Sequence, residues 1–132
     1  RSASQTLNKI KESKDSFSEI IEIQKICKKF FEISDTIEET KLVDLLEELI
    51  LESWNRKKRM NGVLNPELIS IEQYINNIGF KTLKLLGAGG GGYFLVKYDG
   101  ANLAQKESQL QSKKLSLSKL NLSKKGCDIW EI

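Results

Sequence analysis

The chain has 132 residues, enough to bury one hydrophobic core but not two, so we expect a single domain. Its 21 basic and 18 acidic residues are interleaved and give a formal net charge of only +3, which does not support a nucleic-acid-binding surface. No apolar run approaches the ~18 residues of a membrane span. Histidine is absent and the cysteines, Cys27 and Cys127, lie far apart, which argues against a zinc cluster and imidazole catalysis. We therefore expect a cytoplasmic protein with no metal ligands of its own and with neither nucleic acid nor a membrane as partner.

The first half of the chain has the periodicity of amphipathic helices. A short opening helix capped by Ser2 or Ser4 is expected first, followed by a longer helix capped by Ser16 or Ser18. The apolar residues of this longer helix fall largely on one face: Ile20, Ile21, Ile23, Cys27, Phe30 and Phe31. A third helix is expected from about Glu38 to Arg59. Its apolar stripe consists of Leu42, Leu45, Leu46, Leu49, Ile50 and Trp54.

A fourth helix and a change to strands come next. Asn65 before Pro66 is a cap followed by proline at the first helical position, and Gly79 ends the helix. Residues 82–86 and 93–98 are rich in β-branched, aromatic and long apolar side chains, which predicts two strands. Residues 102–113 have the polar composition of another helix.

Two more strands are expected near the C-terminus. An alternation broken once by a bulge predicts the first of them, through Leu115, Leu117, Leu120 and Leu122. Residues 124–126 predict a turn into a last strand over residues 127–132. Together these elements predict an α+β domain with a largely antiparallel sheet and helices on one side of it.

The most informative segment is Lys84-Leu-Leu-Gly-Ala-Gly-Gly-Gly-Gly92, which has five glycines in six positions between two predicted strands. Gly87, Gly89 and Gly92 have the spacing of a dinucleotide-binding loop, but that site needs a helix directly after the loop, where a strand is predicted here. A Walker-type loop is excluded because no Lys-Ser/Thr pair follows. One explanation of the glycines is a tight, bulged hairpin in which some residues take positive φ angles. We favour a second explanation, in which bare backbone N–H groups approach an anionic ligand.

This segment resembles the third, C-terminal motif of the GHMP kinases, the family of galactokinase, homoserine kinase, mevalonate kinase and phosphomevalonate kinase. Three further segments are similar to the heptose-phosphate kinase and fucokinase-like branch of that family: Arg1-Ser-Ala-Ser4, Trp54-Asn-Arg-Lys-Lys58 and Asn65-Pro66. The likeness extends through Val96 and, more loosely, to the closing Lys125-Gly-Cys-Asp-Ile-Trp130.

The resemblance implies that residues 1–132 are the ferredoxin-like C-terminal domain of an ATP-dependent sugar or sugar-phosphate kinase of carbohydrate metabolism. Such an enzyme is a phosphotransferase with an alcohol acceptor, and its small-molecule partner is a sugar or sugar phosphate. It further implies that ATP and Mg²⁺ are bound mainly by an N-terminal domain that precedes Arg1 and is absent from this chain. The chain alone is then expected to be inactive and to carry no catalytic residue. A sheet strand of the related enzymes would also be missing, which predicts an exposed sheet edge that favours self-association.

The candidate site residues follow from the same resemblance. A ligand-binding loop with backbone donors is expected to comprise Gly87, Ala88, Gly89, Gly90, Gly91 and Gly92. Candidate substrate contacts are Arg1, Lys58 and Lys84, and a phosphate-facing role is considered for Lys84. The basic run 56–59 could contact an anionic sugar phosphate. The helix macrodipole also favours cations in a last turn, and we favour this second explanation. An alternative function is a ferredoxin-like regulatory module that binds a small anionic ligand through the same glycines.

Overall fold

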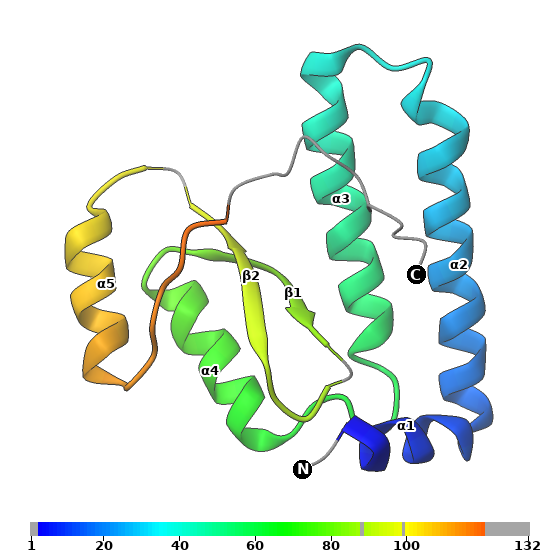
Figure 1. Ribbon diagram of the computed structural model, residues 1–132, viewed down its shortest axis with the longest axis horizontal. Helices are drawn as coiled ribbons and strands as arrows, with labels where there is room; N and C mark the ends of the chain where they lie inside the picture. Colours follow the sequence, from blue (N-terminus) through cyan, green and yellow to red (C-terminus); the bar gives the residue numbers. More distant parts are fainter. Residues whose placement is uncertain (1–2, 88, 99, 121–132) are drawn as a thin grey trace, which may run out of the picture. The chain divides into compact units, whose positions relative to one another are not determined.

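The computed structural model describes residues 3–87, 89–98 and 100–120, which fall into one unit within residues 1–101 and a second unit from Asn102 onward. The first unit contains, in chain order, α1 (Ala3–Lys11), α2 (Lys14–Ser34), α3 (Glu39–Lys57), α4 (Pro66–Asn77), β1 (Lys81–Leu86) and β2 (Tyr93–Lys97) (Figure 1). Within the described residues the sheet is antiparallel and has two strands. The prediction of an α+β fold is therefore confirmed at that level. None of the helices in these residues combines the length and apolar character needed to cross a membrane.

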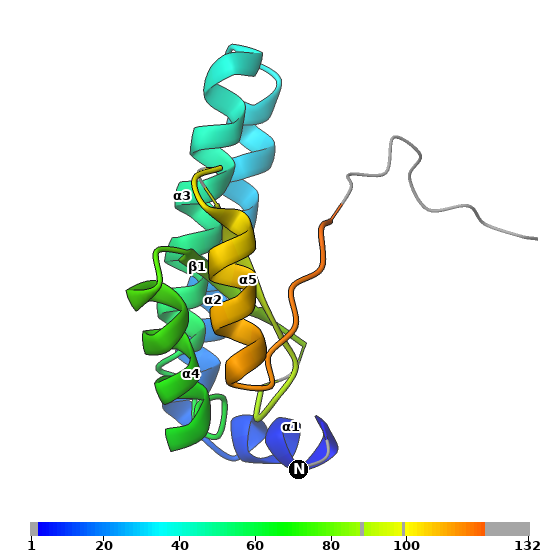
Figure 2. The same cartoon turned by 90° about the vertical axis from the view of Figure 1, so that its left-hand side faces the viewer.

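The helices α2 and α3 form a long antiparallel pair, and α1 lies across the end at which α2 begins and α3 ends (Figures 1 and 2). Ser13 caps α2, because its hydroxyl accepts a hydrogen bond from the Ser16 backbone N–H at 3.3 Å. The prediction of Ser16 or Ser18 as the cap was wrong. Ser16 lies inside the helix, fully buried, and its hydroxyl accepts a hydrogen bond from the Asn61 N–H at 2.9 Å. A residue type that favours caps is used here to join two distant segments instead.

The buried face of α2 differs from the predicted one. Ile26 is buried, whereas Ile20, Ile21 and Phe31 are exposed. Cys27 is also exposed and is a free thiol. The apolar residues of α2 therefore spread over more of its circumference than the neighbouring helices cover. Periodicity identified the helix correctly but not which of its apolar residues face the core.

The start of α4 matches the sequence prediction closely. The Asn65 side chain accepts a hydrogen bond from the Leu68 N–H at 2.9 Å, and Pro66 is the first residue of the helix. At the other end Gly79 has a φ of +88°, a conformation that glycine adopts without steric cost. The chain then enters β1, and both α3 and α4 pack against that strand.

The strands β1 and β2 pair from Lys81↔Lys97 to Leu86↔Tyr93, with an irregularity between Thr82 and Lys84. Such a bulge interrupts the strict alternation of faces, so that Thr82 and Leu83 are both buried. The bulge was not predicted in this strand. It lies upstream of the glycine segment, which closes the hairpin at its other end.

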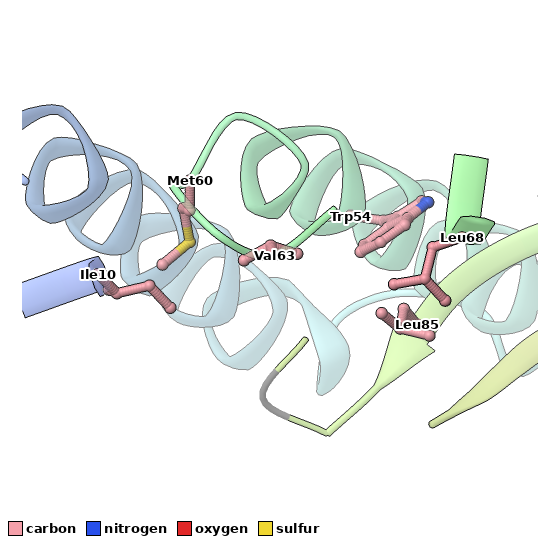
Figure 3. Packing of buried hydrophobic residues seen from close by; sticks show 6 residues of the cluster. All are labelled: Ile10, Trp54, Met60, Val63, Leu68 and Leu85. Atoms are coloured by element: carbon pink, nitrogen blue, oxygen red, sulfur yellow. The ribbon is translucent and has the colours of Figure 1, made fainter. Parts of the chain in front are cut away.

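Buried residues from α1, α3, α4, β1 and the segment after α3 form the core. It consists of Ile10, Trp54, Met60, Val63, Leu68 and Leu85. Figure 3 shows Val63 between Ile10 and Met60 on one side and Trp54, Leu68 and Leu85 on the other. Val63 and Leu85 have no exposed surface, and the exposed fraction of Trp54 is 1%. The connection between α3 and α4 is therefore part of the core, and this fixes its position next to β1.

The open end of the hairpin carries an ion-pair cluster. Lys81 and Lys97 lie directly opposite each other, and the Glu47 carboxylate on α3 contacts both ammonium groups. Like charges in such a pair repel, so Glu47 neutralises an otherwise unfavourable arrangement. Hydrogen bonds from Lys81 and then from Lys97 lower the pKa of Glu47 below its usual 4.5. The same contact with Glu47 raises the pKa of Lys97.

We expect Glu47→Gln to lower the thermal unfolding temperature at neutral pH. A carboxyl whose pKa is lower in the folded state contributes stability above its unfolded pKa, and this contribution disappears as the pH falls through the folded pKa. The difference between wild type and variant should therefore be largest at pH 7 and shrink below pH 4.5, the usual value for this group. Thermal unfolding followed by circular dichroism between pH 7 and pH 3 measures it, with the exposed Glu52→Gln on the same helix as control. A pH-independent difference would contradict the ionic explanation.

The second unit contains α5 (Leu103–Ser112). Its end is a Schellman motif: the Leu115 N–H donates to the Leu110 carbonyl at 3.0 Å, the Lys114 N–H donates to the Gln111 carbonyl at 2.9 Å, and Lys114 has a φ of +58°. The predicted strand from Leu115 to Leu122 was wrong for residues 115–120, which contain no strand. The Leu115 N–H, which would open a strand ladder, ends the helix instead. The remainder of that strand, the turn at 124–126 and the last strand over 127–132 lie outside the described residues.

Candidate functional site

The glycine loop, residues 87–92, connects β1 to β2, and its described residues have an irregular backbone. Positive φ angles occur at Gly87 (+94°), Gly89 (+108°), Gly90 (+75°) and Gly92 (+129°). Residues with a side chain rarely adopt such angles, so the turn itself requires glycine at these positions. At Gly92 a Cβ atom would also lie 2.7 Å from the Leu86 carbonyl oxygen. The hairpin explanation therefore accounts for part of the glycine content.

The loop is attached to the connection between α3 and α4. The Gly90 N–H donates to the Val63 carbonyl at 2.9 Å, and the Asn65 side-chain amide donates to the Gly90 carbonyl at 3.4 Å. A Cβ atom on Gly89 would lie 2.8 Å from the Val63 Cα, closer than real structures allow. Because Val63 is fully buried in the core and Asn65 caps α4, the loop is held against a rigid part of the molecule.

Gly91 is different from its neighbours. It has no positive φ angle, and no heavy atom lies within 4 Å of the position that its Cβ would occupy. Neither the turn nor the packing requires glycine there. The space beside Gly87 is also empty within 4 Å, although its φ angle requires glycine. At Gly87 and Gly91 the loop thus presents bare backbone, which a ligand can approach closely.

A lysine from α3 contacts the start of the loop. Lys57, the last residue of α3, donates a hydrogen bond from its ammonium group to the Gly87 carbonyl (Figure 1 shows the loop close to this end of α3). Burial, and to a smaller extent the positive charge of Lys84 on β1, lowers the pKa of Lys57 below its usual 10.5. The ammonium groups of Lys57 on α3 and Lys84 on β1 are therefore close enough to repel each other.

The other three members of the basic run 56–59 have acidic partners. Arg56 lies 3.6 Å from Glu19 and 3.7 Å from Glu22, and Arg59 lies 3.5 Å from Glu19. Lys58 lies 3.4 Å from the Glu72 carboxylate and 5.5 Å from the centre of the Trp54 ring. Within residues 3–87, 89–98 and 100–120, Lys57 and Lys84 form no ion pair with a carboxylate.

The sequence predictions for the site can now be compared with these positions. Gly87, Gly89, Gly90, Gly91 and Gly92 lie together in one loop, and Lys84 on β1 is near it. Lys58 is engaged by Glu72 and Trp54. Arg1 and Ala88 lie outside the described residues.

Sequence reasoning did not single out Lys57. The basic run 56–59 was considered for contact with an anionic sugar phosphate, but the helix macrodipole was favoured as its explanation. The second contact of Asn65, from its amide group to Gly90, was not anticipated either. The one available signal for this contact is that an Asn cap uses only its side-chain oxygen and leaves two N–H donors for another partner.

The described residues offer no metal centre of their own. No group of three or more His, Cys, Asp or Glu side chains among them is arranged to hold a metal ion. A surface hollow of about 280 Å³ lies at the open end of the hairpin, and its lining includes Glu47, Lys81 and Lys97. That hollow lies at the end of the hairpin opposite the glycine loop and coincides with the ion-pair cluster.

The chain matches no protein-family model, no curated protein and no solved structure. The resemblance to GHMP kinases therefore rests on the residues quoted above.

Proposed function

We propose that this chain is the C-terminal part of an ATP-dependent sugar or sugar-phosphate kinase of the GHMP type, and that its glycine loop lines the substrate cleft. In this proposal the finer fold is ferredoxin-like. The order β1, β2, α5 corresponds to a paired hairpin followed by a helix, and the proposal assigns the remaining strands to segments outside the described residues.

One observation carries the proposal. Three separate segments of the sequence each resemble the family, and two of them contact the third, the glycine loop, in the fold. Lys57, from the Trp54–Lys58 segment, donates to Gly87, and Asn65, from the Asn65-Pro66 segment, donates to Gly90. These contacts span 30 and 25 residues of sequence, so local structure alone does not produce them. A shared site is a physical reason for the three segments to occur in one chain.

The chemistry of the loop fits a supporting role in phosphoryl transfer. This reaction depends mainly on positioning the reacting groups and on neutralising negative charge. The loop can supply backbone N–H donors from its bare backbone, and Lys57 and Lys84 supply positive charge. The described residues beside the loop include no carboxylate cluster suited to Mg²⁺. ATP and Mg²⁺ are therefore assigned in this proposal to a part of the enzyme preceding Arg1.

The test is ATP-dependent phosphorylation by the full-length polypeptide that contains this chain. ADP release is measured in a coupled assay with heptose 7-phosphate, fucose and galactose as acceptors, and a reaction without acceptor is the control. We expect turnover with at least one acceptor. Absence of turnover with every acceptor would reject the kinase and favour a regulatory module that binds a small anionic ligand through the same glycines.

A further inference from the structure

We propose that Lys57 and Lys84 together bind a terminal phosphate group of the ligand, which lies against the glycine loop. The inference rests on the proposed function, but it adds a residue, Lys57, that the family resemblance did not single out. A terminal phosphate can belong to the acceptor sugar or to ATP. The experiment below is arranged to separate these two sources.

The charge distribution is the first argument. Two neighbouring ammonium groups repel each other, and no carboxylate in the described part of the chain neutralises them. Every other cation of the run 56–59 has such a partner. A phosphate monoester carries about −1.5 to −2 charges at pH 7, which matches two lysines.

The geometry is the second argument. An ammonium group has three N–H donors, and the Gly87 carbonyl accepts from the one that Lys57 directs at it. Two donors remain on this ammonium group, which contacts the loop at Gly87. The position of a Cβ on Gly87 has no neighbour within 4 Å, and the same is true of Gly91 further along the loop. A phosphate placed beside Gly87 would meet lysine N–H groups and bare backbone at the same time.

The helix macrodipole does not explain this arrangement. It favours a cation in the last turn of α3, where Arg56 and Lys57 both lie. It does not require that cation to be half-buried beside a second lysine. Burial and, to a smaller extent, the charge of Lys84 lower the pKa of Lys57, so the surroundings disfavour the charged form of this side chain. Groups perturbed in this way are concentrated at functional sites.

The first experiment is a calorimetric titration of this chain with inorganic phosphate at low ionic strength and pH 7. We expect one binding site that weakens about tenfold or more in Lys57→Met and in Lys84→Met, because each replacement removes a charge-assisted hydrogen bond. Lys28→Met, a replacement of an exposed lysine on α2, should leave the affinity unchanged. Circular dichroism verifies folding, and we expect Lys57→Met to fold because it removes a partly buried charge. No binding, or equal weakening by Lys28→Met, would overturn the inference.

The second experiment compares KM values in the full-length polypeptide. We expect Lys57→Met to raise the KM of the phosphorylated acceptor about tenfold or more if the acceptor carries the phosphate, and the KM of ATP if the nucleotide does. An unchanged KM for both substrates would overturn the inference while leaving the kinase intact. Lysine-dependent phosphate binding without any turnover would instead reject the kinase and leave the phosphate site standing.

Discussion

Replacing Trp54 by alanine is expected to lower the free energy of unfolding by about 3 to 5 kcal/mol. The exposed fraction of Trp54 is 1%, and its ring meets Phe94 edge to face with 6.3 Å between centroids. Its indole N–H donates to the Glu72 carboxylate at 2.8 Å, and Lys58 lies over its ring. The alanine variant would leave a large cavity between α3 and the sheet and remove one partner of Glu72. Urea unfolding followed by circular dichroism measures the loss.

Two further variants separate the contributions of this side chain. Trp54→Phe keeps most of the apolar volume but loses the bond to Glu72, so a smaller loss of about 1 to 2 kcal/mol is expected. Phe17→Ala removes an aromatic ring that is 64% exposed and should change the stability by no more than about 0.5 kcal/mol. A loss below about 1 kcal/mol for Trp54→Ala would contradict the central place of this residue in the core.

Gly89→Ala is expected to detach the glycine loop from the connection between α3 and α4. A Cβ atom there would meet the Val63 backbone at 2.8 Å, and the φ of +108° is unfavourable for any residue with a side chain. We expect a loss of stability of about 2 kcal/mol, together with phosphate binding weakened at least about tenfold, because small displacements of a binding group strongly reduce its effect. Urea unfolding and the phosphate titration measure the two effects.

The matched variant is Gly91→Val, two residues further along the loop. No atom lies within 4 Å of its Cβ position and its φ is not positive, so the variant should fold with wild-type stability. If a ligand approaches the bare backbone, the valine side chain should nevertheless weaken phosphate binding. Loss of binding without loss of stability would identify a ligand surface. Wild-type phosphate binding in Gly91→Val would contradict a ligand contact at the bare backbone of Gly91.

The sequence predicted those parts of the fold that depend on neighbouring residues. Asn65 followed by Pro66 marked the start of α4, and the change of periodicity after Gly79 marked both strands. Those signals act within one turn of a helix or along one strand, so a sequence pattern contains them completely. The predicted cap of α2 failed because the Ser16 hydroxyl bonds to Asn61, which is 45 residues away.

The contacts that build the site could not be predicted from local sequence patterns either, because they join residues that are far apart in the chain. The glycines were recognised as unusual, but their separate roles were not. Gly89 faces the Val63 backbone and Gly91 faces open space, and only the fold distinguishes them. Lys57 and Lys58 are adjacent in the sequence, yet one reaches Gly87 and the other Glu72. A rotation of about 100° between successive helical residues is enough to give two neighbouring lysines different partners.

The most direct test of a ligand site at the glycine loop is a phosphate titration followed by ¹H–¹⁵N NMR of this chain. The account predicts that the amide resonances of Gly87, Gly91 and Gly92 shift with a common saturation curve, and that the shifts are lost in Lys57→Met. Shifts confined to exposed lysine-rich segments such as residues 24–29 of α2, with the loop amides unmoved, would contradict it.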